Sequence, residues 1–364
     1  MKIKVCDSTL RDAKFAPSIF FNQEEQLYIA ELLDQVGVEE VELGIPTDSD
    51  EEFETIKAIT SKPFKFRKSC VFFCTNSKNI EKNINRIVDS GCDAVCISIP
   101  TSKEFIDLKL RRSPKATIAL MKKAVKYAVE KGLYVIFSGE DASRADMDFL
   151  IEYVKVGEEY GASRFRFAET VSCLEPKGIR NYMNNIQKNT NIELEIHSHS
   201  GYGLGLANAI ASFDEGVSWV STTVNGIGER GGNTNLIEIL MYLYQFKNQK
   251  NYNISLLKTL SNIVSCYSQD TLSRFTPIVG DAVFEYEILN QYTNADSYEH
   301  FSPEEVGNHR KLVLGKKMSG KTLEYWDIDN DSLEKNRYNL EKYFNEHKKP
   351  ICKELLIHKI KGGI

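Results

Sequence analysis

Short apolar segments alternate with longer amphipathic segments along roughly the first two thirds of the chain. Eight of the apolar segments are rich in Val, Ile and Phe and are bounded by Gly or Pro, as expected for parallel strands buried on both faces. They span residues 3–10, 38–46, 64–73, 94–100, 133–141, 164–170, 192–200 and 219–229. This alternation predicts an α/β fold, a (β/α)8 TIM barrel, with a doubly wound sheet as the alternative.

Helical patterns lie between the predicted strands. The segment 113–132 opens with Ser113 and Pro114, a capping residue followed by proline at the first helical position, and stops at Gly132. After residue 250 the alternation ends: residues 254–269 look helical and 302–307 look like a capped helix start. We therefore expect a TIM-barrel catalytic domain over 1–249 and a smaller, mostly helical C-terminal subdomain over 250–364.

Composition narrows the class of protein. The chain has 364 residues, of which 42% are hydrophobic, and a formal charge of −5 that gives no basic surface for nucleic acid. No apolar run approaches the roughly 20 residues of a membrane span, and the first residues lack a secretory h-region. Eight scattered cysteines without a C-x-x-C pair are typical of reduced thiols. We expect a cytoplasmic protein that binds neither nucleic acid nor membrane.

Polar residues gather where the predicted strands end, which is where barrel enzymes place their active sites. They are Asp7, Arg11, Asp12, Glu42, Glu140, Asp141, Glu169, Thr170, His197 and His199. A ring of structural salt bridges would use the same residue types, because buried charges need partners. The repeated placement at strand ends favours a catalytic mouth.

Two histidines stand two positions apart in "EIHSHSGYG" (195–203). In a strand, residues i and i+2 point to the same face, so His197 and His199 can direct two imidazoles at one point. Two imidazoles and a carboxylate are a common ligand set for a divalent metal with open positions for substrate.

Three motifs carry a family resemblance. "DSTLRD" (7–12), "HSHSGYGLGLAN" (197–208) and "NGIGERGGN" (225–233) closely resemble signatures of the metal-dependent DRE-TIM metallolyases. That family contains isopropylmalate, homocitrate and citramalate synthases, hydroxymethylglutaryl-CoA lyase and some aldolases. Segments 132–150 and 302–320 are similar to the isopropylmalate/homocitrate synthase branch in particular.

The resemblance implies a site and its ligands. The residues at the family's metal positions are Asp12, His197, His199 and Asn233. By the same resemblance Arg11 contacts the polarised oxygen of the substrate, Thr170 binds its carboxylate, and Glu140 is a candidate acid/base. The implied cofactor is a divalent ion (Mg²⁺, Mn²⁺ or Zn²⁺), with acetyl-CoA as co-substrate, a 2-oxo acid as acceptor and a homodimer as the assembly.

The chain departs from the synthase pattern where protons are transferred. Residues 13–15 read Ala-Lys-Phe in place of the usual Gly-Glu-Gln. In "GDAVFEYEILNQ" (280–291), Tyr286 and Gln291 stand at the two histidine positions of the synthases. We therefore expect the metal site to be kept, with Glu140, Tyr286 or another group taking over proton transfer.

Three functions remain open from the sequence. The first is a Claisen-type acyltransferase that condenses acetyl-CoA with a 2-oxo acid outside the usual leucine and lysine pathway set. The second is a metal-dependent lyase or aldolase that cleaves a hydroxy-acid or hydroxyacyl-CoA. The third is a non-catalytic metal- or ligand-binding barrel. The "GIGERGGN" loop lacks the cysteine of hydroxymethylglutaryl-CoA lyases, which favours the synthase.

Overall fold

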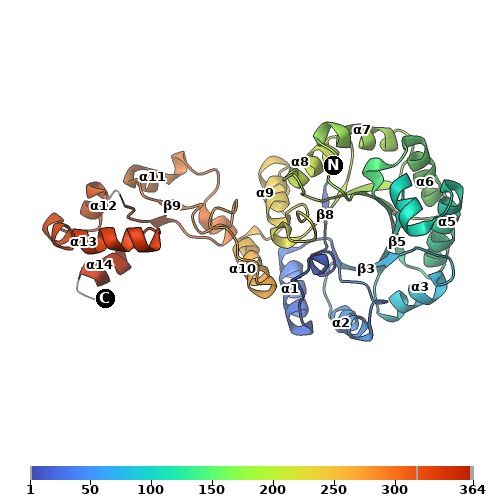
Figure 1. The fold of residues 1–364 in the computed structure, drawn as a ribbon, viewed down its shortest axis with the longest axis horizontal. Coiled ribbons are helices and arrows are strands. Elements are labelled where there is room, and N and C mark those ends of the chain that lie inside the picture. The colour runs from blue at the N-terminus through green and yellow to red at the C-terminus, as the bar shows by residue number, and fades with distance from the viewer. Residues whose placement is uncertain (1, 317–318, 361–364) are drawn as a thin grey trace. The chain divides into compact units, whose positions relative to one another are not determined.

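Eight parallel strands close into a barrel in the order of the sequence, and β8 pairs with β1 (Figure 1). The computed structural model describes residues 2–316 and 319–360. The strands are β1 Lys4–Asp7, β2 Glu40–Glu42, β3 Arg67–Phe73, β4 Ala94–Pro100, β5 Tyr134–Glu140, β6 Arg164–Glu169, β7 Glu193–Ser198 and β8 Trp219–Thr222. Each lies inside one of the eight predicted segments, so the (β/α)8 prediction is confirmed.

Helices surround the barrel and connect successive strands (Figure 1). They are α1 Gln23–Val36, α2 Asp50–Thr60, α3 Ile80–Asp89, α4 Lys103–Phe105, α5 Pro114–Glu130, α6 Met147–Glu159, α7 Pro176–Gln187, α8 Gly205–Phe213, α9 Leu236–Phe246 and α10 Leu257–Ser268. Ser113 caps α5 by accepting from the Ala116 N–H, and Pro114 is its first residue, as predicted.

The chain divides into two compact units between Thr271 and Leu272. The sequence predicted this boundary after residue 249, where the alternation of predicted strands and helices ends. The division lies beyond α10 because this helix packs against α1 of the barrel. Segment 302–307 begins with the predicted Ser302 cap but forms only a 3₁₀ turn, Pro303–Val306.

The second unit is mostly helical and has its own core. It contains β9 Glu285–Tyr286, α11 Leu289–Thr293, β10 Lys311–Leu312, α12 Gly320–Tyr325, α13 Asn330–His347 and α14 Lys353–Ile360. Its buried apolar side chains include Leu314, Leu323, Leu340, Ile351 and Leu356. In the described part of the chain, no helix is long and apolar enough to cross a bilayer.

The two faces of strand β6 pack in different surroundings. On β6, Phe165 contacts Tyr153 of α6 and so lies on the outer face, against the helices. Residues i and i+2 share a face, so Arg164 and Arg166 lie on the other face, inside the barrel. The polar face of this strand is therefore the barrel interior and not a solvent-exposed surface.

Candidate metal and substrate site

A cavity of about 60 Å³ lies at the carboxyl ends of the strands. Among its lining residues are six predicted from the sequence: Arg11, Asp12, Glu140, Thr170, His197 and His199. They come from four different strands or the loops after them. The barrel therefore brings together side chains that lie almost 190 residues apart in the sequence.

Three of the predicted metal ligands converge. One ligand atom from each of Asp12, His197 and His199 lies within 4.8 Å of the others, and all three side chains are buried. The His197 Nδ1 lies 2.9 Å from the Ser221 hydroxyl, and the His199 Nδ1 lies 3.3 Å from the Gly232 carbonyl oxygen. These contacts engage Nδ1 of each ring, so Nε2 is the candidate metal-binding atom of each histidine. The His197 Nε2 lies 3.2 Å from Asp12 Oδ2, another predicted ligand.

Asn233, the fourth predicted ligand, reaches the same region through the loop after β8. It forms an antiparallel bridge with His199, and its side chain is buried. Its Oδ1 has no hydrogen-bond partner among the described residues, although its Nδ2 donates to the Ile227 carbonyl. An unpaired buried amide oxygen beside two imidazoles and a carboxylate is a donor set that fits a divalent cation.

Two glycines of "NGIGERGGN" shape the Asn233 loop. Gly228 has φ +150°, and a Cβ there would lie 2.3 Å from the Asn233 Nδ2. Gly232 has φ +76°, and a Cβ there would lie 2.0 Å from the Gly226 carbonyl oxygen. A side chain at either position would displace the loop, so these glycines allow Asn233 to approach His199.

The protonation states favour metal binding. Burial, and then the neighbouring His197, lower the pKa of His199 to about 3, so this imidazole is neutral at pH 7. Burial would raise the pKa of Asp12, but the Arg11 guanidinium and His197 outweigh it and hold that pKa well below its usual range. A neutral imidazole and an ionised carboxylate are the forms that bind metal.

Arg11 is held on both sides. Its Nε and Nη2 lie 2.5 Å from Glu42 Oε2, and its Nη1 lies 3.1 Å from Asp12 Oδ1. Burial would raise the pKa of Glu42, but Arg11 and Arg166 outweigh it and hold that pKa at about 2. The guanidinium is thus fixed beside the metal ligands, at the wall of the cavity.

Glu140 and Thr170 both line the cavity. Glu140 ends β5 and pairs with Lys109, which lies in the π-helical turn Ile106–Leu110. The Thr170 Oγ1 accepts a hydrogen bond from the Asp141 N–H at 2.9 Å, which leaves its own hydroxyl hydrogen free to donate. Both side chains are therefore positioned at the cavity, and their roles stay predictions.

Tyr286 lies in the second unit, on β9. Its hydroxyl donates to Glu299 Oε1 at 2.9 Å, and burial together with that carboxylate raises its pKa to about 12. A phenol with such a pKa stays protonated at pH 7. The catalytic role of Tyr286 stays a prediction.

Sequence reasoning missed Arg166, which lines the cavity and is almost fully buried. It donates to Glu42 Oε1 at 2.7 Å, so it shares this carboxylate with Arg11. The available signal was "RFRF" (164–167), in which arginines alternate with phenylalanines inside a buried strand. In a barrel strand, that alternation places charges in the interior.

A model of the HMGL-like family matches residues 2–264. The chain belongs to the HMGL-like family. The resemblance to the DRE-TIM metallolyases is therefore confirmed, and the cavity residues and the four predicted metal ligands lie within the matched segment, whereas Tyr286 lies outside it. The match shows the family of the chain, and the role of each site residue stays a prediction.

Two relatives of this family member are synthases. The 2-isopropylmalate synthase 2 of Caldanaerobacter subterraneus subsp. tengcongensis is 35% identical, and the alignment covers 86% of this chain and 82% of the relative. The homocitrate synthase AksA of Methanothermobacter thermautotrophicus is 33% identical, over 86% of this chain and 81% of the relative. The HMG-CoA lyase of Brucella melitensis shares the fold, with a TM-score of 0.66 and 14% identity over 74% of this chain and 99% of that one.

Proposed function

We propose that this protein is a metal-dependent acyltransferase that condenses an acyl-CoA, most simply acetyl-CoA, with a 2-oxo acid. One observation carries the proposal: the buried group of Asp12, His197 and His199 lies beside Arg11 at the cavity, in a chain whose similar relatives are 2-isopropylmalate and homocitrate synthases. This donor set and a neighbouring cation suit a substrate that chelates through a carboxylate and a ketone.

The chemistry assigns a step to each group. The methyl group of the thioester loses a proton to a base, and the resulting carbanion forms a carbon–carbon bond to the keto carbon. The keto oxygen becomes an alkoxide, which takes up a proton to give a hydroxyl group. Water then hydrolyses the thioester, and free CoA leaves. When bound, a divalent ion (Mg²⁺, Mn²⁺ or Zn²⁺) at Asp12, His197, His199 and Asn233 supplies Lewis acidity.

The chain's own side chains complete the site in this proposal. Arg11 directs its remaining N–H groups at the oxygen that becomes an alkoxide, and Thr170 donates its hydroxyl to the acid's carboxylate. Glu140, which lines the cavity, is the first candidate for proton transfer, and Tyr286 is the second. We also propose that the enzyme is cytoplasmic, as its scattered cysteines suggest, and that it is a homodimer, as the family resemblance implies.

A thiol-release assay tests the proposal. The protein is incubated with acetyl-CoA and a panel of 2-oxo acids, with metal removed by a chelator and then restored with Mg²⁺, Mn²⁺ or Zn²⁺. We expect CoA release that requires both an oxo acid and a metal. Cleavage of a hydroxyacyl-CoA without any condensation would replace the proposal by a lyase. The absence of both reactions with metal bound would favour a binding protein.

A further inference from the structure

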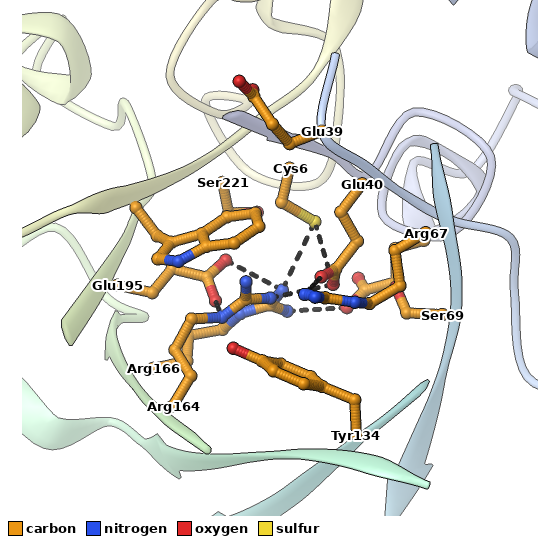
Figure 2. A network of polar contacts seen from close by, with 12 residues as sticks. Cys6, Glu39, Glu40, Arg67, Ser69, Tyr134, Arg164, Arg166, Glu195 and Ser221 are labelled. Carbon is orange, nitrogen blue, oxygen red and sulfur yellow. Dashed lines mark hydrogen bonds and ion pairs between the residues drawn. The ribbon is translucent and has the colours of Figure 1, made fainter. Parts of the chain in front are cut away.

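A continuous series of buried salt bridges runs through the interior of the barrel from the cavity. It links Arg11, Glu42, Arg166, Glu195, Arg164 and Glu40, and we refer to these six residues as the interior network. Figure 2 shows Arg164 and Arg166 lying side by side next to Glu195, close to Cys6 and Glu40.

Each carboxylate of the interior network bridges two arginines with its two oxygens. Glu42 binds Arg11 through Oε2 and Arg166 through Oε1, at 2.5 and 2.7 Å. Glu195 binds Arg166 through Oε1 at 2.9 Å and Arg164 through Oε2 at 2.8 Å. Glu40 binds Arg164 through Oε1 at 2.8 Å and, through Oε2 at 3.3 Å, Arg67, which lies outside the six. The charges alternate in sign along the network, so each charge has a partner.

Strand periodicity explains why the interior network reaches the site. Glu40 and Glu42 stand two apart on β2, as do Arg164 and Arg166 on β6. Glu195 stands two before His197 on β7, so it shares the inward face with a predicted metal ligand. The same periodicity that places His197 in the cavity therefore places a carboxylate directly beneath it.

The two arginines of β6 differ in their partners, and of the two only the Arg164 guanidinium lies over the Trp219 ring, 3.8 Å from its centroid. Arg164 and Arg166 are equally buried, and both bind Glu195. Arg166 lines the cavity and shares Glu42 with Arg11, whereas Arg164 binds Glu40 farther from the cavity. Buried ion pairs are often no more stabilising than apolar residues of similar volume, so stability alone is a weak reason for this network.

We propose that Arg166 and Glu195 are positioning residues that orient the Arg11 guanidinium through Glu42. Arg166 neutralises and fixes the Glu42 oxygen that faces away from Arg11, and Glu195 fixes Arg166 in turn. Arg11 therefore meets a carboxylate that is held in one orientation. The expected change in kcat rests on the proposed function. The expected displacement of Arg11 rests on the geometry alone.

The kinetic test compares Arg166→Met with Arg164→Met, which removes an equally buried arginine from the same carboxylate. We expect Arg166→Met to lower the kcat of CoA release by about 10- to 100-fold, with the KM for the oxo acid changed less than about threefold, because a misplaced donor loses transition-state stabilisation. Arg164→Met should leave kcat within about threefold of the unchanged enzyme. Equal losses in both variants would overturn the proposal.

A structural test keeps the inference separate from the proposed reaction. Crystal structures of both variants should show the Arg11 guanidinium displaced from Glu42 in Arg166→Met and retained in Arg164→Met. An unmoved Arg11 in Arg166→Met would refute the positioning role, whether or not the protein releases CoA. If the methionine variants do not fold, Arg166→Lys and Arg164→Lys keep the charge and remove the guanidinium fork, and the same contrast applies.

Discussion

The two halves of the barrel interior differ in chemistry although they share one fold. On β2, β6 and β7 the interior carries the charges of the interior network, whereas on β3, β4 and β5 it carries an apolar cluster. The cluster consists of Val71, Ala94, Cys96 and Ile136 on these strands, together with Ile45 from the loop after β2. The two halves meet where Ile136 on β5 pairs in register with Arg164 on β6.

The difference shows which part of the interior serves the site. Arg166 of the charged half lines the cavity together with Arg11, Asp12 and His197, while β3, β4 and β5 contribute Val71 and Cys96 but also Ser98, Ser138 and Glu140. Packing alone could fill both halves with apolar side chains, as in most barrels of this kind. The buried charges on β6 and β7 lie on the strands that lead to Thr170 and His197, which ties them to this side of the site, whereas Glu140 ends β5 in the apolar half.

The largest expected effect comes from breaking the interior network. Arg164→Met removes one ion-pair partner from Glu40 and one from Glu195, which keep only Arg67 and Arg166 respectively. Removing one member of a buried ion pair costs about 3–5 kcal/mol of unfolding free energy. Urea unfolding of the variant and the unchanged protein measures the loss. A loss below about 1 kcal/mol would mean that the buried carboxylates find other partners.

Low pH should reduce the contribution of the charged half to the free energy of unfolding. The folded-state pKa of Glu42 is about 2, below its ordinary value of 4.5, so its contribution to stability is complete above pH 4.5 and is lost as the pH falls toward 2. The shift corresponds to about 3 kcal/mol. Unfolding free energies measured at pH 6 and pH 3 should differ less in Glu42→Gln than in the unchanged protein. An equal difference in both would show that Glu42 does not cause the acid sensitivity.

Replacing Arg11 should affect the reaction more than the fold. Arg11→Ala should lower kcat by on the order of 100-fold or more, since a transition-state donor is lost. Arg11→Lys should not restore full activity, because a single ammonium lacks the guanidinium fork that meets Glu42 and the substrate. The CoA-release assay provides the measurement, and full activity in Arg11→Lys would show that charge alone suffices.

The apolar half should tolerate change best. Ile136→Val removes one buried methylene and should cost about 1 kcal/mol of unfolding free energy, with kcat essentially unchanged. It is a matched partner for Arg164→Met because the two positions are register neighbours. A loss of activity as large as that of Arg11→Ala would break the distinction between the two halves.

The sequence predicted the barrel because each buried parallel strand forms a compact apolar run. It also predicted the cavity residues, because polar side chains at successive strand ends must meet at one mouth of a barrel. The interior network was not predicted. Polar residues that alternate with phenylalanines suggest a solvent-exposed face, and only the closed barrel turns that face inward.

The domain boundary depends on packing that local sequence does not reveal. Residues 254–269 predict a helix, and α10 forms there, but its packing against α1 assigns it to the barrel. For Tyr286, the sequence predicted only that it stands at a histidine position of the synthase motif. Its hydrogen bond to Glu299 comes from side chains 13 residues apart that no periodic pattern relates.

Metal stoichiometry tests the central claim, that the charged half of the barrel ends in a metal site. Elemental analysis of the purified protein, after dialysis against Mg²⁺, Mn²⁺ or Zn²⁺, should give about one equivalent of a divalent metal per chain. His199→Ala should abolish this content while far-ultraviolet circular dichroism shows the barrel still folded. The unchanged protein without stoichiometric metal, or a His199→Ala variant with unchanged metal content, would contradict the account.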